Sequence, residues 1–98
     1  KGFLCYKAFG NTSFNFPSSW KVRANSILKE VVNPNRTDDC GCGVNVANSL
    51  EWCKKNYPLA TSYYICEIPF DRLCDVVVPY NTNGKFRCGY VKLIKKVK

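Results

Sequence analysis

Histidine is absent from the sequence and acidic residues are few, since seven aspartates and glutamates stand against fifteen lysines and arginines. Without histidine, the chain has no imidazole base, no histidine metal ligand and no zinc finger of the Cys/His kind. The shortage of acids leaves a net charge of +8 at pH 7, which favours acidic partners. No apolar run approaches the roughly 20 residues of a membrane helix, so we expect no membrane association.

The composition is otherwise that of a globular chain, with 46% hydrophobic and 22% charged residues. A length of 98 residues suits a single domain, here 1–98. Cys5, Cys66 and Cys88 lie in apolar segments, where a free thiol packs as a small hydrophobe. We therefore expect a reduced, intracellular chain, and a secreted chain with disulfides is the alternative.

Alternating and β-branched residues predict short strands, at 2–9, 20–23, 27–32, 44–46, 61–68, 75–79 and 85–97, the last with a break at a glycine. One helix is expected at about 48–57, because Asn48 and Glu51 form a capping-box pattern and Pro58 prevents continuation. These elements predict an α+β domain, with a curved, mostly antiparallel sheet of five to seven short strands and one main helix.

The positive charge is concentrated at the end of the chain, since residues 84–98 carry six basic and no acidic groups. Residues 32–83, by contrast, have a net charge of −2. Aromatic residues are mixed with these bases, a composition typical of surfaces that track phosphates and stack bases. The alternative is a solvated edge strand whose lysines prevent aggregation. The candidate residues for binding nucleic acid or another acidic partner are Lys54, Lys55, Lys85, Arg87, Lys92, Lys95 and Lys96.

Cys40 and Cys42 flank a single glycine and form the densest thiol motif. Zinc knuckles place two residues between paired cysteines and need a second pair to complete a tetrahedron, so we expect no metal. The same tight spacing disfavours a disulfide between the two. Gly41 and Gly43 are instead expected to turn the chain sharply into the strand at 44–46. No Walker or Rossmann fingerprint is present, and we expect no cofactor.

Groups suited to catalysis are scarce. With no histidine, a general base would have to be an aspartate, Glu67 or a lysine of lowered pKa, and a cysteine nucleophile would lack its usual activator. Glu67 belongs to the strand expected at 61–68, where it faces either solvent or a cleft. The composition therefore favours binding over catalysis and singles out no catalytic residue.

Four short motifs follow one another along the chain: LCYKA at 4–8, CGCGVNV at 40–46, YICEIP at 64–69 and GKFRC at 84–88. This layout resembles small uncharacterised proteins carried by bacteriophages and large DNA viruses. In those proteins a Tyr-Lys-Ala start, a central Cys-x-x-Gly-Leu-His-type segment and a late Lys-x-Arg segment recur. The resemblance spans most of the chain and implies a small viral accessory protein, although the central histidine is replaced here by Asn45.

The order of elements is also distantly similar to the core of ADP-ribosyltransferase-like domains. By position, Tyr6 or Lys7 stands where that family has a first-strand arginine or histidine, and Asn45 stands at its middle position. No glutamate follows Glu67, so the late catalytic glutamate of the family has no counterpart. The resemblance implies a ligand-binding version without the transferase chemistry, with a cleft lined by these four residues.

Three functions follow from these observations. The first is a small basic protein of viral or phage type that binds a host protein or nucleic acid in the host cytoplasm, through the basic last strand and the helix face around Lys54 and Lys55. The second is a nucleotide-binding domain or small enzyme with the cleft just described. The third is a secreted, disulfide-bonded protein that interacts with a host.

Overall fold

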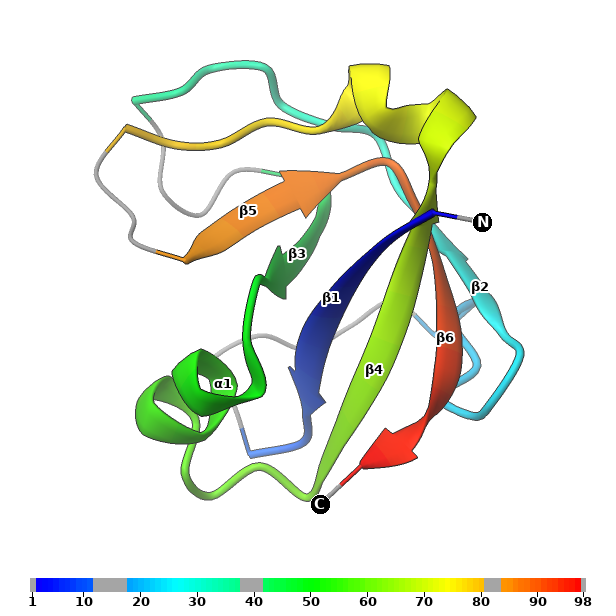
Figure 1. The fold of residues 1–98 in the computed structure, drawn as a ribbon, viewed down its shortest axis with the longest axis vertical. Coiled ribbons are helices and arrows are strands. Elements are labelled where there is room, and N and C mark those ends of the chain that lie inside the picture. The colour runs from blue at the N-terminus through cyan, green and yellow to red at the C-terminus, as the bar shows by residue number, and fades with distance from the viewer. Residues whose placement is uncertain (1, 12–17, 38–41, 81–83, 98) are drawn as a thin grey trace.

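A single antiparallel sheet organises the computed structural model, which describes residues 2–11, 18–37, 42–80 and 84–97 (Figure 1). Its six strands are β1 (Gly2–Phe9), β2 (Ile27–Lys29), β3 (Val44–Ala47), β4 (Ser62–Pro69), β5 (Lys85–Cys88) and β6 (Tyr90–Val97). They lie in the order β2-β6-β4-β1-β3-β5, with every neighbouring pair antiparallel. An α-helix, α1 (Leu50–Asn56), and a 3-10 helix, η1 (Phe70–Asp75), complete the fold. The predicted class, an α+β domain with a curved antiparallel sheet and one main helix, is confirmed.

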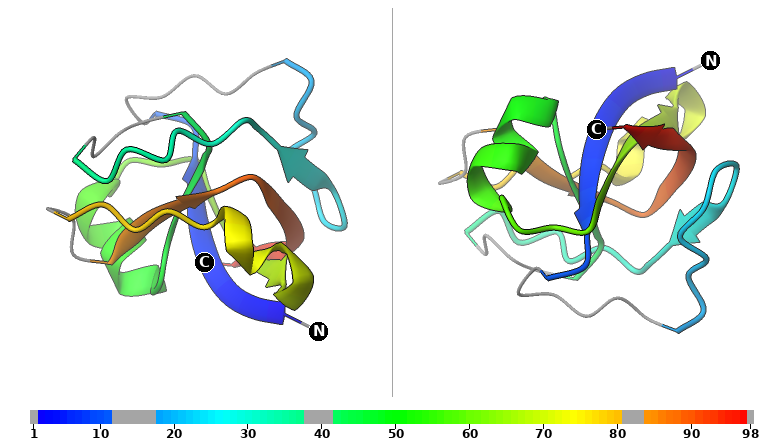
Figure 2. Two further views of the ribbon diagram at one scale, coloured as in Figure 1. Left: turned by 90° about the horizontal axis from the view of Figure 1, so that it is seen from above. Right: turned by 90° about the horizontal axis from the view of Figure 1, so that it is seen from below.

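The sheet curls, so that its two faces have different surroundings (Figure 2). Successive side chains of a strand point to opposite faces. In β1, for example, Cys5, Lys7 and Phe9 are buried on the inner face, whereas Leu4 and Tyr6 belong to the outer face. The buried apolar side chains form one core, made of Cys5, Phe9, Trp20, Leu28, Val44, Val46, Tyr64, Cys66, Ile68, Phe86, Cys88, Val91 and Leu93.

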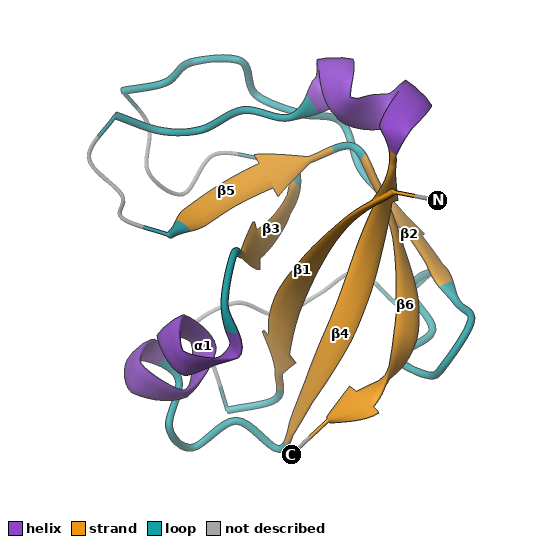
Figure 3. Ribbon diagram, in the orientation of Figure 1, coloured by secondary structure: helices purple, strands orange, loops and turns teal. Residues whose placement is uncertain are grey.

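The helix α1 begins one residue later than its sequence pattern predicts. Ser49, not Asn48, is the N-cap, and its Oγ accepts a hydrogen bond from the backbone N–H of Trp52 at 3.1 Å. The backbone N–H of Asn48 instead donates to the carbonyl of Gly84 at 2.8 Å, so Asn48 still belongs to the β3–β5 pairing. Figure 3 shows the two helices at different ends of the sheet. Neither described helix is long and apolar enough to cross a membrane.

Two predicted strands are wrong. Residues 20–23 are not assigned to a strand; Trp20 packs in the core, and its indole N–H donates to the carbonyl of Lys29 at 3.2 Å. Asp75 is the last residue of η1, and residues 76–79 pair with β5 through one bridge, between Val77 and Arg87. The predicted division of 85–97 at its glycine is confirmed, since β5 ends and β6 begins on either side of Gly89.

Candidate functional site

Tyrosines and lysines from distant parts of the sequence meet on the outer face of β1, β4 and β6. Tyr6 is paired with Ile65, and Ile65 with Lys95, so these side chains form one row across the sheet. Tyr63 lies two residues before Ile65, and Tyr90 two before Lys92, and alternate residues of a strand share a face. We call this surface the tyrosine face, and it comprises Tyr6, Tyr63, Ile65, Tyr90, Lys92 and Lys95.

The rings of the tyrosine face are half-buried, and cations lie beside two of them. The Nζ of Lys54 is 5.9 Å from the ring centre of Tyr63, and the guanidinium carbon of Arg72 is 4.5 Å from that of Tyr90. Both distances lie within the range of cation–π attraction. Within β1, β4 and β6 the one acidic residue is Glu67, which is paired with Lys92. The surface therefore combines aromatic rings with a positive charge excess.

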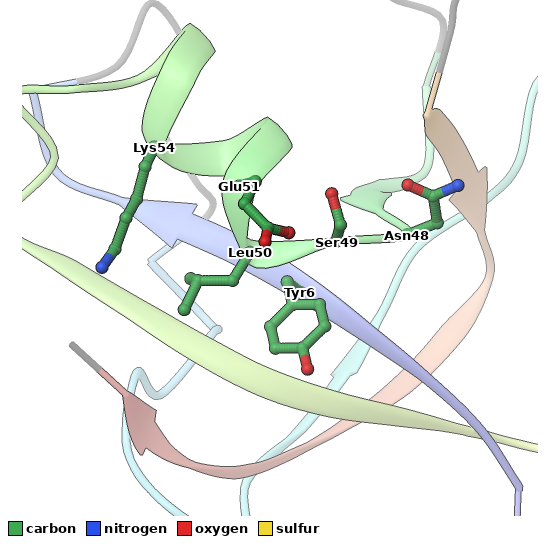
Figure 4. Close-up of a pocket in the computed structure, with 6 residues that line it drawn as sticks. All are labelled: Tyr6, Asn48, Ser49, Leu50, Glu51 and Lys54. Carbon is green, nitrogen blue, oxygen red and sulfur yellow. The ribbon is translucent and has the colours of Figure 1, made fainter.

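A pocket of about 450 Å³ adjoins the tyrosine face where α1 meets β1. It is lined by Tyr6 together with Asn48, Ser49, Leu50, Glu51 and Lys54. Figure 4 shows Leu50 and Glu51 on the helix side facing the Tyr6 ring. Tyr6 belongs to both the pocket and the tyrosine face, so the two form one continuous surface.

Five of the seven predicted basic residues lie at the surface or on the tyrosine face. Lys54 and Lys55 are exposed on α1. Lys92 and Lys95 belong to the tyrosine face, whereas Lys96 is exposed and paired with the inner-face residue Tyr64. The adjacent residues Lys95 and Lys96 therefore point to opposite faces. Of the remaining two, Lys85 is half-buried at the start of β5.

Arg87, which the sequence analysis names among the candidate binding residues, is not at the surface. The side chain is fully buried, with 0% exposure. Its Nε donates to the carbonyl of Asn33 at 2.8 Å and its Nη2 to that of Asn35 at 2.6 Å. The reason is that β5 is covered by the 33–35 loop and by the bridge at Val77. Arg87 holds this loop against the sheet.

The four residues of the predicted cleft do not come together. Tyr6 and Glu67 lie on the outer face, where Glu67 is half-buried, and Lys7 lies on the inner face. Lys7 and Asn45 do touch, since the Nζ of Lys7 donates to the backbone carbonyl of Asn45 at 2.7 Å. Adjacent residues such as Tyr6 and Lys7 cannot line one cleft, because they point to opposite faces of the same strand.

Lys7 is a charged residue whose side chain is buried on the apolar inner face of the sheet. Its Nζ lies 5.5 Å from the ring centre of Phe9 and 5.7 Å from that of Trp20. Burial lowers the pKa of Lys7 from 10.5 to about 8, against the opposing effect of nearby thiols. The amine therefore remains largely charged at neutral pH, and its hydrogen bond and aromatic contacts offset part of the cost of burying this charge.

While they are buried in the folded chain, the thiols of the inner face are unsuited to nucleophilic chemistry. Burial raises the pKa of Cys53 to about 11 and that of Cys88 to about 12. A protonated thiol is a weak nucleophile, and these side chains act as packing residues and weak donors, as Cys88 does toward the carbonyl of Val44. Among the described residues no cluster of Cys, Asp or Glu is placed to hold a metal ion. Cys40 and Gly41 lie outside the described residues, whereas Gly43 turns the chain with a φ of 136°.

No family model, no curated protein and no solved structure matches the chain. The function is therefore inferred from the geometry of the two faces. The sequence analysis did not identify Tyr63, Tyr90 or Arg72 as candidate site residues. For the two tyrosines a signal was present, because Tyr63 precedes Ile65 and Tyr90 precedes Lys92 at the two-residue spacing of one strand face.

Proposed function

We propose that the protein binds single-stranded nucleic acid across the tyrosine face. The observation that carries the proposal is the register of β1, β4 and β6, which puts Tyr6, Tyr63 and Tyr90 on one half-exposed face with Lys92 and Lys95. Proteins that bind single strands combine aromatic rings, on which bases stack, with cations that contact the phosphates. The tyrosine face has both kinds of group side by side.

The charge distribution supports the same partner. Lys92 and Lys95 come from the last fifteen residues, which carry six basic and no acidic groups. Lys54 and Arg72 add a cation beside Tyr63 and Tyr90, respectively. A base that stacks on either ring brings its phosphate close to a positive charge. Since phosphate contacts release counterions, affinity should fall steeply with added salt.

The shape of the surface favours a single strand over a duplex. The rings belong to a half-buried sheet surface, and the main helix, α1, is only seven residues long. A sheet surface with tyrosines suits bases that are already unstacked, whereas a duplex hides the faces of its bases. The pocket of about 450 Å³ beside Tyr6 gives one such base a place to enter.

The test is a titration of fluorescently labelled single-stranded oligonucleotides, with binding followed by anisotropy at several salt concentrations. We expect Lys95→Glu to weaken binding at least tenfold at low salt, and Lys96→Glu, which makes the same charge change on the opposite face, to weaken it much less. We expect Tyr6→Leu to lose affinity while Tyr6→Phe keeps it, because stacking contributes roughly 1–3 kcal/mol per base.

Two results would contradict the proposal. One is an absence of single-strand binding by the unchanged chain at low salt. The other is an equal loss for Lys95→Glu and Lys96→Glu with no effect of Tyr6→Leu, since charge alone would then explain the association. Displacement of the oligonucleotide by polyglutamate at the same charge concentration would assign the surface to an acidic protein instead.

A further inference from the structure

Two cysteines lie directly opposite each other on neighbouring central strands. Cys5 of β1 is paired with Cys66 of β4, and both side chains are on the inner face with 0% exposure. Directly opposed residues of an antiparallel pair have Cα atoms about 4.5 or 5.5 Å apart. Disulfides span Cα distances of roughly 4.4–6.8 Å. The backbone of β1 and β4 therefore already has the spacing that a bond between these two residues needs.

The two thiols also interact in the reduced chain. A hydrogen bond with Cys66, followed by burial, holds the pKa of Cys5 well above its usual range. The Sγ of Cys66 also donates to the carbonyl of Tyr64 at 3.6 Å, and this hydrogen bond is lost when the sulfur joins Cys5. The other buried thiols differ, because Cys88 is paired with Val44 and Cys53 lies on α1.

We propose that Cys5 and Cys66 form a reversible disulfide that fastens β1 to β4. The oxidant is a small disulfide, such as oxidised glutathione. One cysteine thiolate attacks it, forms a mixed disulfide and releases one glutathione thiolate. The second cysteine thiolate attacks the mixed disulfide at the first cysteine's sulfur and releases the other. Two electrons pass from the cysteines to the oxidant, and the two cysteine protons are taken up by the released thiolates or the solvent.

Burial determines when this exchange happens. Both sulfurs are shielded from solvent in the folded chain, and the protonated thiol of Cys5 is a poor nucleophile. Exchange therefore requires β1 and β4 to separate transiently, after which the bond closes within the core. The pair lies on the face opposite the tyrosine face, so the inference does not depend on the proposed function.

The experiment equilibrates the full chain in glutathione buffers of increasing oxidised fraction, with a low urea concentration that allows opening. Remaining thiols are blocked by alkylation, and disulfide-linked peptides are identified by mass spectrometry without reduction. We expect the peptide pair containing Cys5 and Cys66 to be the main intramolecular link. The exposed Cys42 and Cys74 should instead carry single glutathione groups. The oxidised chain should have a Tm roughly 10 °C higher than the reduced one.

Matched variants test whether the link forms between Cys5 and Cys66 and not with another buried thiol. Cys66→Ala should abolish both the linked peptide and the rise in Tm. Cys88→Ala, which removes another fully buried thiol from the same face, should leave both in place. The proposal is overturned if the unchanged chain shows no Cys5–Cys66 link after equilibration in oxidised glutathione. It is also overturned if Cys5 or Cys66 links mainly to Cys53 or Cys88.

Discussion

The inner and outer faces of one sheet put the same residue types to different uses. On the inner face, Lys7 donates to a backbone carbonyl and lies against two aromatic rings. On the outer face, Lys95 is exposed at the end of a row that continues through half-buried Ile65 to half-buried Tyr6. Both lysines belong to strands with alternating patterns. The comparison shows that strand register decides whether a lysine is buried and contributes to packing or is exposed and free to contact a partner.

The largest expected contrast comes from one substitution made on each face. Leu93 is fully buried on the inner face, whereas Leu4 is 53% exposed on the outer face. Leu93→Ala should lower the free energy of unfolding by about 4 kcal/mol, because it leaves a cavity in the core. Leu4→Ala should lower it by less than about 1 kcal/mol. Urea denaturation measures both, and equal losses would contradict the assignment of the two faces.

A second contrast compares a buried with an exposed cation. Arg87→Ala removes two charged hydrogen bonds and leaves the carbonyls of Asn33 and Asn35 without this donor, so we expect a loss of about 3 kcal/mol in the free energy of unfolding. Lys95→Ala should change it by less than about 0.5 kcal/mol. The same denaturation series measures the two variants. A neutral Arg87→Ala would show that the 33–35 loop does not depend on this side chain.

The smallest expected effect is a pH dependence due to Lys7. The unfolded chain holds this proton up to about pH 10.5, whereas the folded chain releases it at about pH 8. Because the unfolded state binds more protons between these values, the contribution of Lys7 to the free energy of unfolding rises with pH there. Relative to Lys7→Met, the unchanged chain should gain about 2 kcal/mol between pH 8 and about pH 9.5.

Denaturation of both chains in reducing buffer at a series of pH values measures this gain. The comparison with Lys7→Met removes the titration of groups that do not interact with Lys7. A difference between the two chains that stays constant across this pH range would contradict the burial of the Lys7 amine.

Much of the fold could be predicted because it depends on local patterns. The alternation in 2–9 and the break at Gly89 predicted β1 and the division between β5 and β6. The segment 20–23 alternates equally well, yet it belongs to none of the six strands, and Trp20 packs in the core from outside the sheet. Local alternation does not distinguish these cases, because a strand also needs a neighbour with which to pair.

Less of the candidate site than of the fold could be predicted from the sequence. The excess of lysines near the end of the chain was visible, and Lys92 and Lys95 lie on the tyrosine face. The burial of Arg87 was not visible, since its partners are carbonyls more than fifty residues away. Residues so far apart in the chain are brought together only by long-range strand pairing and by the loop that covers β5.

The sequence by itself determined the charge, the absence of imidazole chemistry, the α+β class and the alternation that gives each strand two different faces. The tertiary structure decided which strands are neighbours and in which register. That choice made a row of Tyr6, Ile65 and Lys95 and set Cys5 against Cys66. The physical reason is that alternation assigns a side chain to a face, whereas its partner across the sheet depends on backbone hydrogen bonds between distant segments.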